Sequence, residues 1–375
     1  MGADLHKGCN PLQLLRLCAR SHRNDGMRAA VYYGPNKLEV EDVPEPEPTA
    51  GTVKVRVGFN GICGTDLHEY YAGPIFVPTE PHPLTGQQMP LTMGHEFSGT
   101  ITAVGSGVTD WAEGDRVAIM PLYRCGHCPA CRAGNYNICA QIGFHGLMSD
   151  GGMAEYTVVP TDMLHRLPDN VSLELGALVE PMSVAYHAAT LGEPNADGTS
   201  MVFGAGPIGI GLWFALRGKG VEDVFVVEPS ATRRAAIEAL GARTLDPTAL
   251  DVPAFIADHT DGRGADAVYD AAGVAPAVET ALACVGARRA MVSVAIYEKP
   301  LTTPLLNLVM NESRIQGSLC YTAPDFAAVI DLMSRGVYDT TGWVTPIAID
   351  DVIDEGFEAL HAGTKMKVLV DPGAA

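Results

Sequence analysis

The chain has 375 residues, of which 47% are hydrophobic and 18% are charged, a composition typical of globular proteins and not of disordered ones. Its 25 Lys and Arg residues against 44 Asp and Glu residues give a net charge of −19, which argues against nucleic acid or an anionic membrane as a partner. The cysteines number nine and no signal peptide is recognisable, so reduced thiols or metal ligation are favoured over a disulfide framework. We therefore expect a cytoplasmic protein of two or three domains.

The first part of the chain predicts a short extension and then a β-rich domain. Residues 1–26 carry basic residues around a leucine cluster. We interpret them as a disordered N-terminal extension, because the first regular strand pattern, MRAAVYY, begins at Met27. From there to about residue 181 the chain is rich in Gly and Pro, with short β-type runs such as TVKVRVGF, whose alternating valines mark a half-buried strand.

After residue 182 strands alternate with helices, which predicts a doubly wound parallel sheet. The elements are the strand MVF, the turn GAGPIG with a helix, the strand VFVV, a helix capped by Ser230, the strand ADAVYD, a helix from Pro276 and the strand AMVSV. An uncharged run over residues 198–216 has nearly the length of a membrane span, but its glycines and Pro207 would break a single helix. The closing strand KVLV resembles the first part, which indicates that the α/β domain is inserted into the first domain.

A group of closely spaced cysteines is the strongest chemical signal in the sequence. The spacing C-x2-C-x2-C-x7-C comprises Cys125, Cys128, Cys131 and Cys139. Thiolates this close together can complete a tetrahedral shell around Zn²⁺ and leave no position for substrate, so the spacing predicts a structural zinc site. A nucleic-acid-binding zinc module would need a basic helix, which the segment lacks. An iron–sulfur site of the bacterial ferredoxin type would have Pro after its last Cys.

A second set of ligand-type residues is dispersed along the chain. It comprises Cys63 in GICGTDLH, His95 and Glu96 in GHE, and Glu180 in VEP. A thiolate, an imidazole and a carboxylate would leave a further zinc position open, as a catalytic zinc requires. Each of these residues alone is more often an ordinary core residue, and their spacing does not show that they meet.

The stretch DLHEYY has the pattern of the first turns of a helix. Residues three apart lie on one helix face, so Thr65 and His68 would form a proton relay from a metal-bound oxygen towards solvent. The alternatives are a helix N-cap for Thr65 and a surface histidine for His68.

A glycine-rich turn predicts a dinucleotide site. It follows a strand, precedes a helix and contains Gly204, Gly206, Pro207, Ile208 and Gly209. Its glycines would let the backbone approach a pyrophosphate at the helix N-terminus. Glu228 ends the next strand, 19 residues after Gly209, where it would accept hydrogen bonds from the adenosine ribose and repel a 2′-phosphate, which favours NAD over NADP. Arg233 and Arg234 follow one helical turn later and could weaken that preference, although a solvated helix face is the simpler interpretation.

These elements, in this order, resemble the zinc-dependent medium-chain alcohol dehydrogenases from Met27 to about Asp371. The resemblance is carried by GICGTDLH, GHEFSGTITAVGSGVTDWAEGDRV, the four-cysteine loop, DGGMAEY, VEPMSVAYHA and VFGAGPIGIG. Within the family the chain is most similar to the 2,3-butanediol dehydrogenase and sorbitol dehydrogenase branch. The stretches AGPIFVPTEPHPLTG and VVEPSATRR resemble butanediol dehydrogenases in particular.

The resemblance implies a fold and a set of roles. The α/β fold would combine a GroES-like β-rich catalytic domain, over residues 27–181 and 320–375, with an inserted Rossmann doubly wound parallel-sheet domain over residues 182–319. It implies NAD, two zincs per chain and a homodimer or homotetramer. The implied roles are catalytic-zinc ligation by Cys63, His95 and, directly or through water, Glu96 and Glu180; a proton relay by Thr65 and His68; NAD binding by Gly204, Gly206, Gly209 and Glu228; and structural-zinc ligation by Cys125, Cys128, Cys131 and Cys139.

One departure from the family pattern narrows the substrate. In GSLCYT, Cys320 stands where sorbitol dehydrogenases resemble one another in carrying an arginine, while Tyr321 is kept. Loss of that donor favours a small diol or hydroxyketone, with 2,3-butanediol oxidised to acetoin and the reverse reduction. The alternatives are sorbitol or another polyol, L-threonine, and a non-enzymatic NADH-binding role. A zinc-free quinone reductase of the same fold is opposed by Cys63, His95 and the four-cysteine loop.

Overall fold

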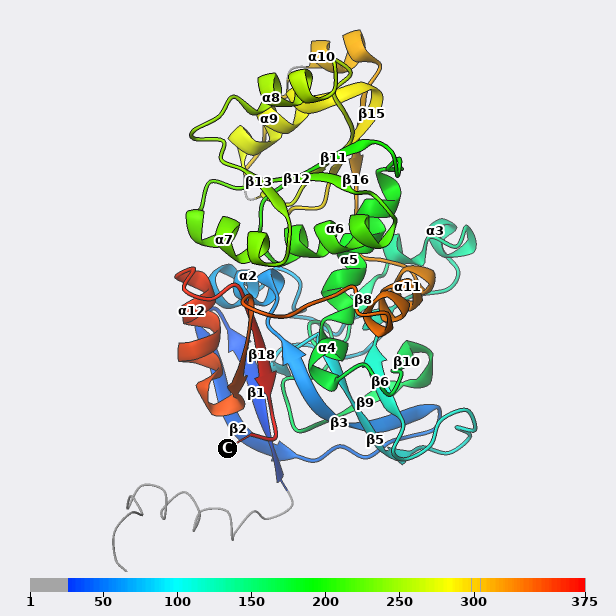
Figure 1. Ribbon diagram of the computed structural model, residues 1–375. Helices are drawn as coiled ribbons and strands as arrows, with labels where there is room; N and C mark the ends of the chain where they lie inside the picture. The colour runs from blue at the N-terminus through cyan, green and yellow to red at the C-terminus, as the bar shows by residue number, and fades with distance from the viewer. Residues whose placement is uncertain (1–25, 298, 304, 375) are drawn as a thin grey trace, which may run out of the picture.

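The structure is a computed structural model and describes residues 26–297, 299–303 and 305–374. The predicted N-terminal extension lies outside the described residues except for Gly26, where β1 begins one residue before the expected Met27. Figure 1 shows a β-rich part and a second part built around another sheet, with α5 (Val179–Leu191) running between them.

The β-rich part contains a seven-stranded sheet made by both ends of the chain. Its order is β10 (Leu164–Arg166), β6 (Arg116–Ile119), β5 (Glu96–Val104), β3 (Thr52–Gly61), β18 (Lys367–Asp371) and β17 (Val344–Ala348), with β9 (Tyr156–Pro160) also paired to β3. The last strand pairs antiparallel with β3, Leu369 opposite Gly61, so the C-terminal tail returns to the first part of the chain as the sequence predicted. One smaller sheet has the order β2 (Lys37–Pro44), β1 (Gly26–Gly34) and β4 (Leu91–Thr92). Another pairs β7 (Leu122–Tyr123) with β8 (Gly143–Phe144).

The second part is the predicted doubly wound parallel sheet. Its order is β13 (Arg243–Leu245), β12 (Asp223–Val227), β11 (Thr199–Phe203), β14 (Ala265–Asp270), β15 (Val285–Ser293) and β16 (Arg314–Gly317), and every pair is parallel. The helices of this part are α6 (Pro207–Gly218), α7 (Ala231–Ala239), α8 (Val252–His259), α9 (Ala275–Cys284) and α10 (Leu305–Asn311). The strand order reverses between β11 and β14, where such sheets bind ligands at the carboxyl ends of their strands. The sequence pattern missed β13 and α8, which are short and half-exposed.

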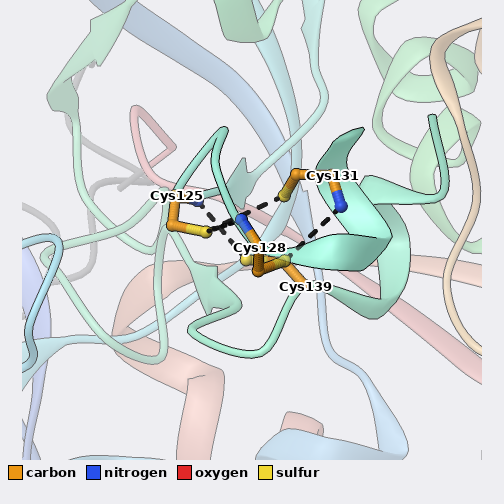
Figure 2. A group of neighbouring side chains, drawn as sticks. All are labelled: Cys125, Cys128, Cys131 and Cys139. Atoms are coloured by element: carbon orange, nitrogen blue, oxygen red, sulfur yellow. Dashed lines mark hydrogen bonds between the residues drawn. The ribbon is translucent and has the colours of Figure 1, made fainter. Parts of the chain in front are cut away.

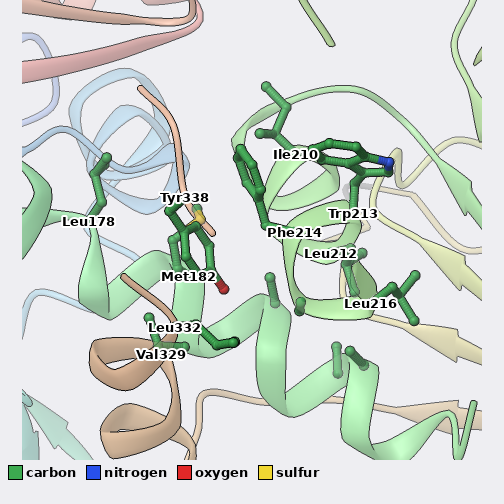
Figure 3. Packing of buried hydrophobic residues seen from close by; sticks show 14 of the residues in the cluster. Leu178, Met182, Ile210, Leu212, Trp213, Phe214, Leu216, Val329, Leu332 and Tyr338 are labelled. Carbon is green, nitrogen blue, oxygen red and sulfur yellow. The ribbon is translucent and has the colours of Figure 1, made fainter. Parts of the chain in front are cut away.

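One hydrophobic core joins the two parts. Figure 3 shows α5, α6 and α11 (Ala323–Ser334) packing together through Met182, Phe214 and Leu332. The same cluster reaches Ala118 of β6 and Val202 of β11, one strand from each sheet. The remaining elements are α2 (Gly64–Ala72), α3 (Pro129–Arg132), α4 (Leu173–Ala177), α12 (Ala359–His361), the short 3₁₀-helices η2 (Tyr136–Ile138), η3 (Thr161–Met163) and η4 (Ile349–Asp351), and the π-helix η5 (Val352–Glu358).

The uncharged run over residues 198–216 forms β11, the glycine-rich turn and most of α6. Across the described residues, no helix has the length and apolar character that crossing a membrane requires. Because the turn divides this run between a strand and a helix, the run does not form the single continuous helix that a membrane span needs.

Candidate functional site

Three of the dispersed ligand-type residues come together in the fold. One ligand atom from each of Cys63, His95 and Glu96 lies within 4.8 Å of the others. Cys63 is the N-cap residue of α2, directly after β3, and Glu96 begins β5. The antiparallel β3–β5 pair sets Gly61 opposite Glu96, and this register brings the residues that flank the pair into one cluster.

Asp66 contacts two of these residues, Cys63 through its backbone and His95 through its ring. It is fully buried; one carboxylate oxygen accepts the Cys63 backbone N–H at 2.9 Å and the other lies 3.4 Å from His95 Nδ1. A metal-bound histidine usually directs its second ring nitrogen to such a carboxylate. Burial disfavours the charged ring, but the negative charges of Asp66 and Cys63 outweigh it and raise the pKa of His95 well above its usual value. The cluster therefore stabilises positive charge, as a cation site must.

Glu96 already has a cationic partner. The Nζ of Lys367 on β18 donates to Glu96 Oε2 and, at 3.0 Å, to the carbonyl of Ile62. Both charged side chains are almost fully buried, and the negative charge of Glu96 outweighs burial and raises the pKa of Lys367. A Cβ at Gly61 would collide with Glu96 Oε2, so glycine at this position leaves room for the ion pair.

Glu180 lies beside this trio and is held separately. It comes from the first turn of α5, and its Oε1 accepts the Tyr321 hydroxyl at 2.6 Å. Burial is the main cause that raises the pKa of Glu180 to about 7; the charge of His95 opposes this rise, and that of Glu96 adds to it. Glu180 is therefore close enough for the charges of His95 and Glu96 to change its pKa, although it is not in the group formed by Cys63, His95 and Glu96.

The predicted relay residues lie on α2. Thr65 Oγ1 is 3.6 Å from Cys63 Sγ, so Thr65 stands next to the cluster. The N-cap position belongs to Cys63, which removes the alternative interpretation of Thr65 as a helix cap. His68 follows three residues later and is only partly buried, as a relay towards solvent requires.

The four cysteines of the loop also form one group. Figure 2 shows the side chains of Cys125, Cys128, Cys131 and Cys139 converging, and their sulfur atoms lie within 4.8 Å of one another. Three come from the segment leading into and through α3, and the fourth follows η2. The short spacing thus suffices to assemble a complete thiol shell.

Backbone N–H groups point at these sulfur atoms. The N–H of Cys128 donates to Cys125 Sγ at 3.3 Å, that of Cys131 to Cys128 Sγ at 3.4 Å, and that of Cys125 to Cys139 Sγ at 3.3 Å. Hydrogen bonds from the backbone N–H groups of Cys131 and Ala140 lower the pKa of Cys128 to about 6. Burial and the neighbouring Cys128 raise the pKa of Cys131 to about 12. Since the thiolate is the metal ligand, the hydrogen bonds at Cys128 favour the ligand form of that residue.

The glycine-rich turn joins β11 to α6 as predicted. Gly204 has φ of +99°, a conformation that side chains rarely adopt, and a Cβ on Gly209 would collide with the Gly204 carbonyl. Gly206 is the N-cap residue of α6, and open space lies where its Cβ would stand. Pro207 and Ile208 open the helix. The turn is therefore a cradle at a helix N-terminus that a phosphate fits.

Glu228 is fixed against this turn at the end of β12. Its Oε2 accepts the Ala205 N–H at 2.8 Å and its Oε1 accepts the Ser230 N–H at 2.9 Å. The side chain is buried. Each oxygen keeps a further lone pair, so the carboxylate can still accept from a ligand hydroxyl.

The two arginines of α7 differ. Arg234 pairs with Asp246 at 2.8 Å and donates to the carbonyls of Glu228 and Pro229, so its guanidinium is engaged. Arg233 is exposed, and its backbone N–H donates to the N-cap Ser230. The exposed position agrees with the interpretation of Arg233 as part of a solvated helix face.

Asp66 and Lys367 are site residues that the sequence interpretation did not assign. Asp66 stands three residues after the N-cap Cys63, the spacing of a capping box, and that signal was available in the sequence. Lys367 has no local signal, because it is 271 residues from Glu96.

Comparisons with known proteins agree with this geometry. The family model "Alcohol dehydrogenase GroES-like domain" matches residues 49–169, and "Zinc-binding dehydrogenase" matches residues 207–335. An (R,R)-butanediol dehydrogenase of Bacillus subtilis is 40% identical and covers 92% of this chain and 100% of its own. The crystal structure of 2R,3R-butanediol dehydrogenase from that organism has a TM-score of 0.87 with the same identity and coverage.

Two further matches widen the range of relatives. A Saccharomyces cerevisiae protein named diacetyl reductase 2, (R)-acetoin forming, is 36% identical over 84% of this chain and 81% of its own. A zinc-binding dehydrogenase of Sinorhizobium meliloti, bound to NADP in its crystal structure, is 30% identical with a TM-score of 0.84 and covers 93% of this chain and all of its own.

The fold and the matches define a class of enzyme: an oxidoreductase acting on alcohols, with a GroES-like domain and a Rossmann-type domain. The predicted α/β fold is therefore confirmed. Within that class, the chain belongs to the zinc-dependent medium-chain alcohol dehydrogenase family, in its butanediol dehydrogenase branch. The predicted zinc and nicotinamide cofactor agree with this family.

Proposed function

We propose that this protein is an NAD-dependent zinc enzyme that interconverts 2,3-butanediol and acetoin. The observation that carries the proposal is the meeting of Cys63, His95 and Glu96 in a chain whose relatives are named for butanediol and for diacetyl and acetoin. Because two of these relatives are named for the (R,R) diol, that stereoisomer is the first to test.

The donor set fits a catalytic zinc. A thiolate, an imidazole and a carboxylate are ligands that Zn²⁺ prefers, and Asp66 beside His95 supplies the carboxylate partner usual for a ligating histidine. We assign Cys63 and His95 as ligands, with Glu96 or Glu180 as the exchangeable carboxylate. When bound, zinc would supply Lewis-acid stabilisation of the substrate oxygen.

Protein side chains would then move the proton. Thr65, 3.6 Å from Cys63 Sγ, is placed to accept the substrate hydroxyl proton and to pass it towards His68 at the partly exposed side of α2. The nicotinamide would supply the hydride acceptor. The chain contributes orientation and charge, since Asp66 and Lys367 hold His95 and Glu96 in place.

The four-cysteine loop supports a second, structural zinc. Its four sulfur atoms lie within 4.8 Å of one another, and four thiolates can complete a tetrahedral zinc shell that leaves no position for substrate. We therefore propose two zincs per chain, one bound by Cys125, Cys128, Cys131 and Cys139 and one bound by the dispersed cluster.

Glu228 supports NAD as the preferred cofactor. Its buried carboxylate stands beside the glycine-rich turn, where it would accept from ribose hydroxyls and repel a 2′-phosphate. Arg234 is engaged by Asp246 and is poorly placed to bind a phosphate. Since one relative of similar fold binds NADP, the preference needs a direct measurement.

Cys320 supports a small substrate. It is buried, and burial followed by the charges of Glu180 and Cys63 raises its pKa, so a neutral thiol stands near the proposed catalytic zinc. A neutral group offers a long polyol no charged donor. Sorbitol, another polyol and L-threonine stay the alternatives of the same family.

We also propose a homo-oligomer. The edge strand β16 and the helix α10 expose a row of apolar side chains, namely Leu305, Leu306, Val309, Met310 and Ile315. An open sheet edge beside exposed apolar surface is typical of an interface, and a second copy of the chain meets it with the same patch. The domain division at residues 181–182 and 319–320, and a cytoplasmic location, stay predictions.

The test is NADH formation by the purified protein with each stereoisomer of 2,3-butanediol, with sorbitol and L-threonine as controls, before and after chelation. A stereoselective rate with butanediol that chelation abolishes supports the proposal. A faster rate with sorbitol or threonine would keep the zinc chemistry and overturn the substrate.

A further inference from the structure

The turn η2 inside the four-cysteine loop contacts a segment that bears on the proposed catalytic site. The segment 318–322 connects β16 to α11 and carries Tyr321, whose hydroxyl donates to Glu180 at 2.6 Å. Its ends are joined to the neighbouring elements, since the Ser318 N–H donates to the Ser293 carbonyl and the Thr322 carbonyl accepts the Phe326 N–H of α11. Between these ends, residues 319–321 make no backbone–backbone hydrogen bond within the described part of the chain. Its position must therefore come largely from contacts with other segments. Figure 1 shows the α3 region beside α11.

Asn137 is the first of these contacts. The side chain is buried, and its Nδ2 donates to the Leu319 carbonyl at 2.9 Å and lies 3.5 Å from His187 Nε2. The His187 Nδ1 faces Asp325 at 2.9 Å; because a carboxylate only accepts, Nδ1 carries a proton, and in the neutral ring Nε2 is then the acceptor. Both N–H groups of the Asn137 amide therefore face an acceptor. A carboxylate at the same place would have no N–H group to donate to either acceptor.

Tyr136 is the second contact. Its hydroxyl oxygen accepts the Ala323 N–H, the first residue of α11, at 2.5 Å. Its ring is held on the loop side by the Arg124 guanidinium, 4.8 Å from the ring centroid and next to Cys125. The two neighbouring residues of η2 thus hold the chain on both sides of Tyr321.

The same segment is anchored to α5 in two places. Glu180 and His187 are seven residues apart on α5, so they lie on one helix face, and they meet Tyr321 and Asp325 respectively. Asn137 also approaches His187. The loop, the connecting segment and α5 therefore form one hydrogen-bonded unit that begins between two cysteines and ends at Glu180.

We propose that Asn137 and Tyr136 are positioning residues that fix the segment 318–322 through their contacts with Leu319 and Ala323, so that the Tyr321 hydroxyl stays hydrogen-bonded to Glu180. The four-cysteine loop thereby acts on the chemistry at a distance, through Tyr136 and Asn137, which lie between Cys131 and Cys139. The proposal deepens the proposed function, because Glu180 is one of its exchangeable carboxylates.

The test compares full-length, zinc-loaded variants. Asn137→Asp keeps the shape of the side chain and removes both donors, and Tyr136→Phe keeps the ring and removes the acceptor. Asn135→Asp is the matched control, because Asn135 is exposed on the same loop and its side chain makes no capping hydrogen bond. Zinc per chain is measured in each variant, and we expect it to equal that of the wild type.

The first readout is amide hydrogen exchange of the peptide covering residues 318–326, which depends on no substrate. We expect faster exchange in Asn137→Asp and Tyr136→Phe and wild-type exchange in Asn135→Asp. Wild-type exchange in both test variants would overturn the proposal. Because this readout needs no activity, it stands even if butanediol proves not to be the substrate.

The second readout is kcat/KM with whichever alcohol the wild type oxidises fastest. Because Asn137→Asp leaves the Leu319 carbonyl without its donor and loosens the segment that carries Tyr321, we expect about a tenfold loss of kcat/KM, which corresponds to about 1.4 kcal/mol. In a Tyr321→Phe background the same substitution should cost less than about twofold, because residues that act through one contact are not additive. Equal losses in both backgrounds would show that Asn137 does not act through Tyr321, and would overturn the proposal.

Discussion

The two clusters of ligand-type side chains are built in opposite ways. The four thiols come from one short segment and receive hydrogen bonds from backbone N–H groups of that same segment. The dispersed cluster draws on the end of β3, the start of β5, the first turn of α5 and, through Lys367, the last strand of the chain. The first can form wherever the loop forms, whereas the second exists only when both ends of the chain have packed.

The electrostatics of the clusters differ for the same reason. In the loop, hydrogen bonds lower the pKa of Cys128 to about 6; those from the backbone N–H groups of Cys131 and Ala140 contribute most, and those with the Cys131 and Cys125 thiols add to them. Among the dispersed residues, His95 and Glu96 have buried partners of opposite charge in Asp66 and Lys367, and the neighbouring Glu180 accepts the neutral Tyr321 hydroxyl. A local site is stabilised by its backbone, and a tertiary site needs paired charges, since a buried charge without a partner is costly.

The largest expected effect separates the two clusters by activity. Cys63→Ser should reduce turnover by more than the roughly 10- to 100-fold that loss of an outer partner costs, because a direct ligand is removed, and NADH affinity should be nearly unchanged. Cys128→Ser removes a ligand of the proposed structural zinc, so we expect it to lose one zinc per chain but to keep measurable turnover. Metal analysis, NADH titration and kcat decide. Full activity in Cys63→Ser would remove the catalytic-zinc assignment.

The second prediction tests how far the tertiary cluster depends on its buried ion pair. Lys367→Met leaves Glu96 buried without a cation, and we expect the free energy of unfolding of the metal-free protein to fall by about 3–5 kcal/mol. Lys365→Met, two residues away, breaks a pair with the exposed Glu355 and should cost at most about 1 kcal/mol. Denaturant unfolding of the chelated proteins measures both. Equal losses would show that burial of the pair is unimportant.

The third prediction concerns the glycine-rich turn. This turn is intermediate between the local cysteine loop and the dispersed cluster, because its partner Glu228 comes from the next strand of the sheet. Glu228→Ala should reduce the preference for NAD over NADP by about 10- to 100-fold, the value of one hydrogen bond to a charged group. Glu228→Gln keeps an acceptor for Ala205 and Ser230 but loses the charge, so it separates repulsion of the 2′-phosphate from damage to the turn. The ratio of kcat/KM for the two cofactors is the measurement, and an unmoved ratio in both variants would contradict the ribose role.

The smallest expected effect tests the connection between the clusters. Burial opposes ionisation of Asp325, but hydrogen bonds from His187 and Thr322 outweigh it and hold the pKa of Asp325 below its usual 3.8. A depressed carboxyl pKa in the folded state stabilises the protein above about pH 4, and this stabilisation is lost as the pH falls through the folded-state pKa. Asp325→Asn should therefore cost about 1 kcal/mol at pH 7 and progressively less on acidification.

The control for this substitution lies on the same helix. Asp331 forms an exposed pair with Arg335, so Asp331→Asn should change the free energy of unfolding by at most a few tenths of a kcal/mol at any pH. Unfolding curves at several pH values compare the two variants. A pH-independent difference for Asp325→Asn would show that its carboxylate charge does not stabilise the link to α5.

Much of the molecule followed from the sequence by itself. The alternation of strands and helices after residue 182 predicted the parallel sheet, the glycine pattern predicted the turn between β11 and α6, and the spacing of four cysteines predicted their convergence. In each case the information is local, because strand period, left-handed glycine and short loop closure are properties of neighbouring residues.

Only the tertiary structure decided how the distant residues meet. Nothing near Lys367 in the sequence indicates that it pairs with Glu96, because that contact depends on the pairing of β18 with β3, which the whole α/β part separates in the sequence. The same holds for Asn137 and Leu319, which are 182 residues apart. Contacts of this kind are fixed by strand register and by which buried charge finds a partner, and both are settled by packing of the complete chain.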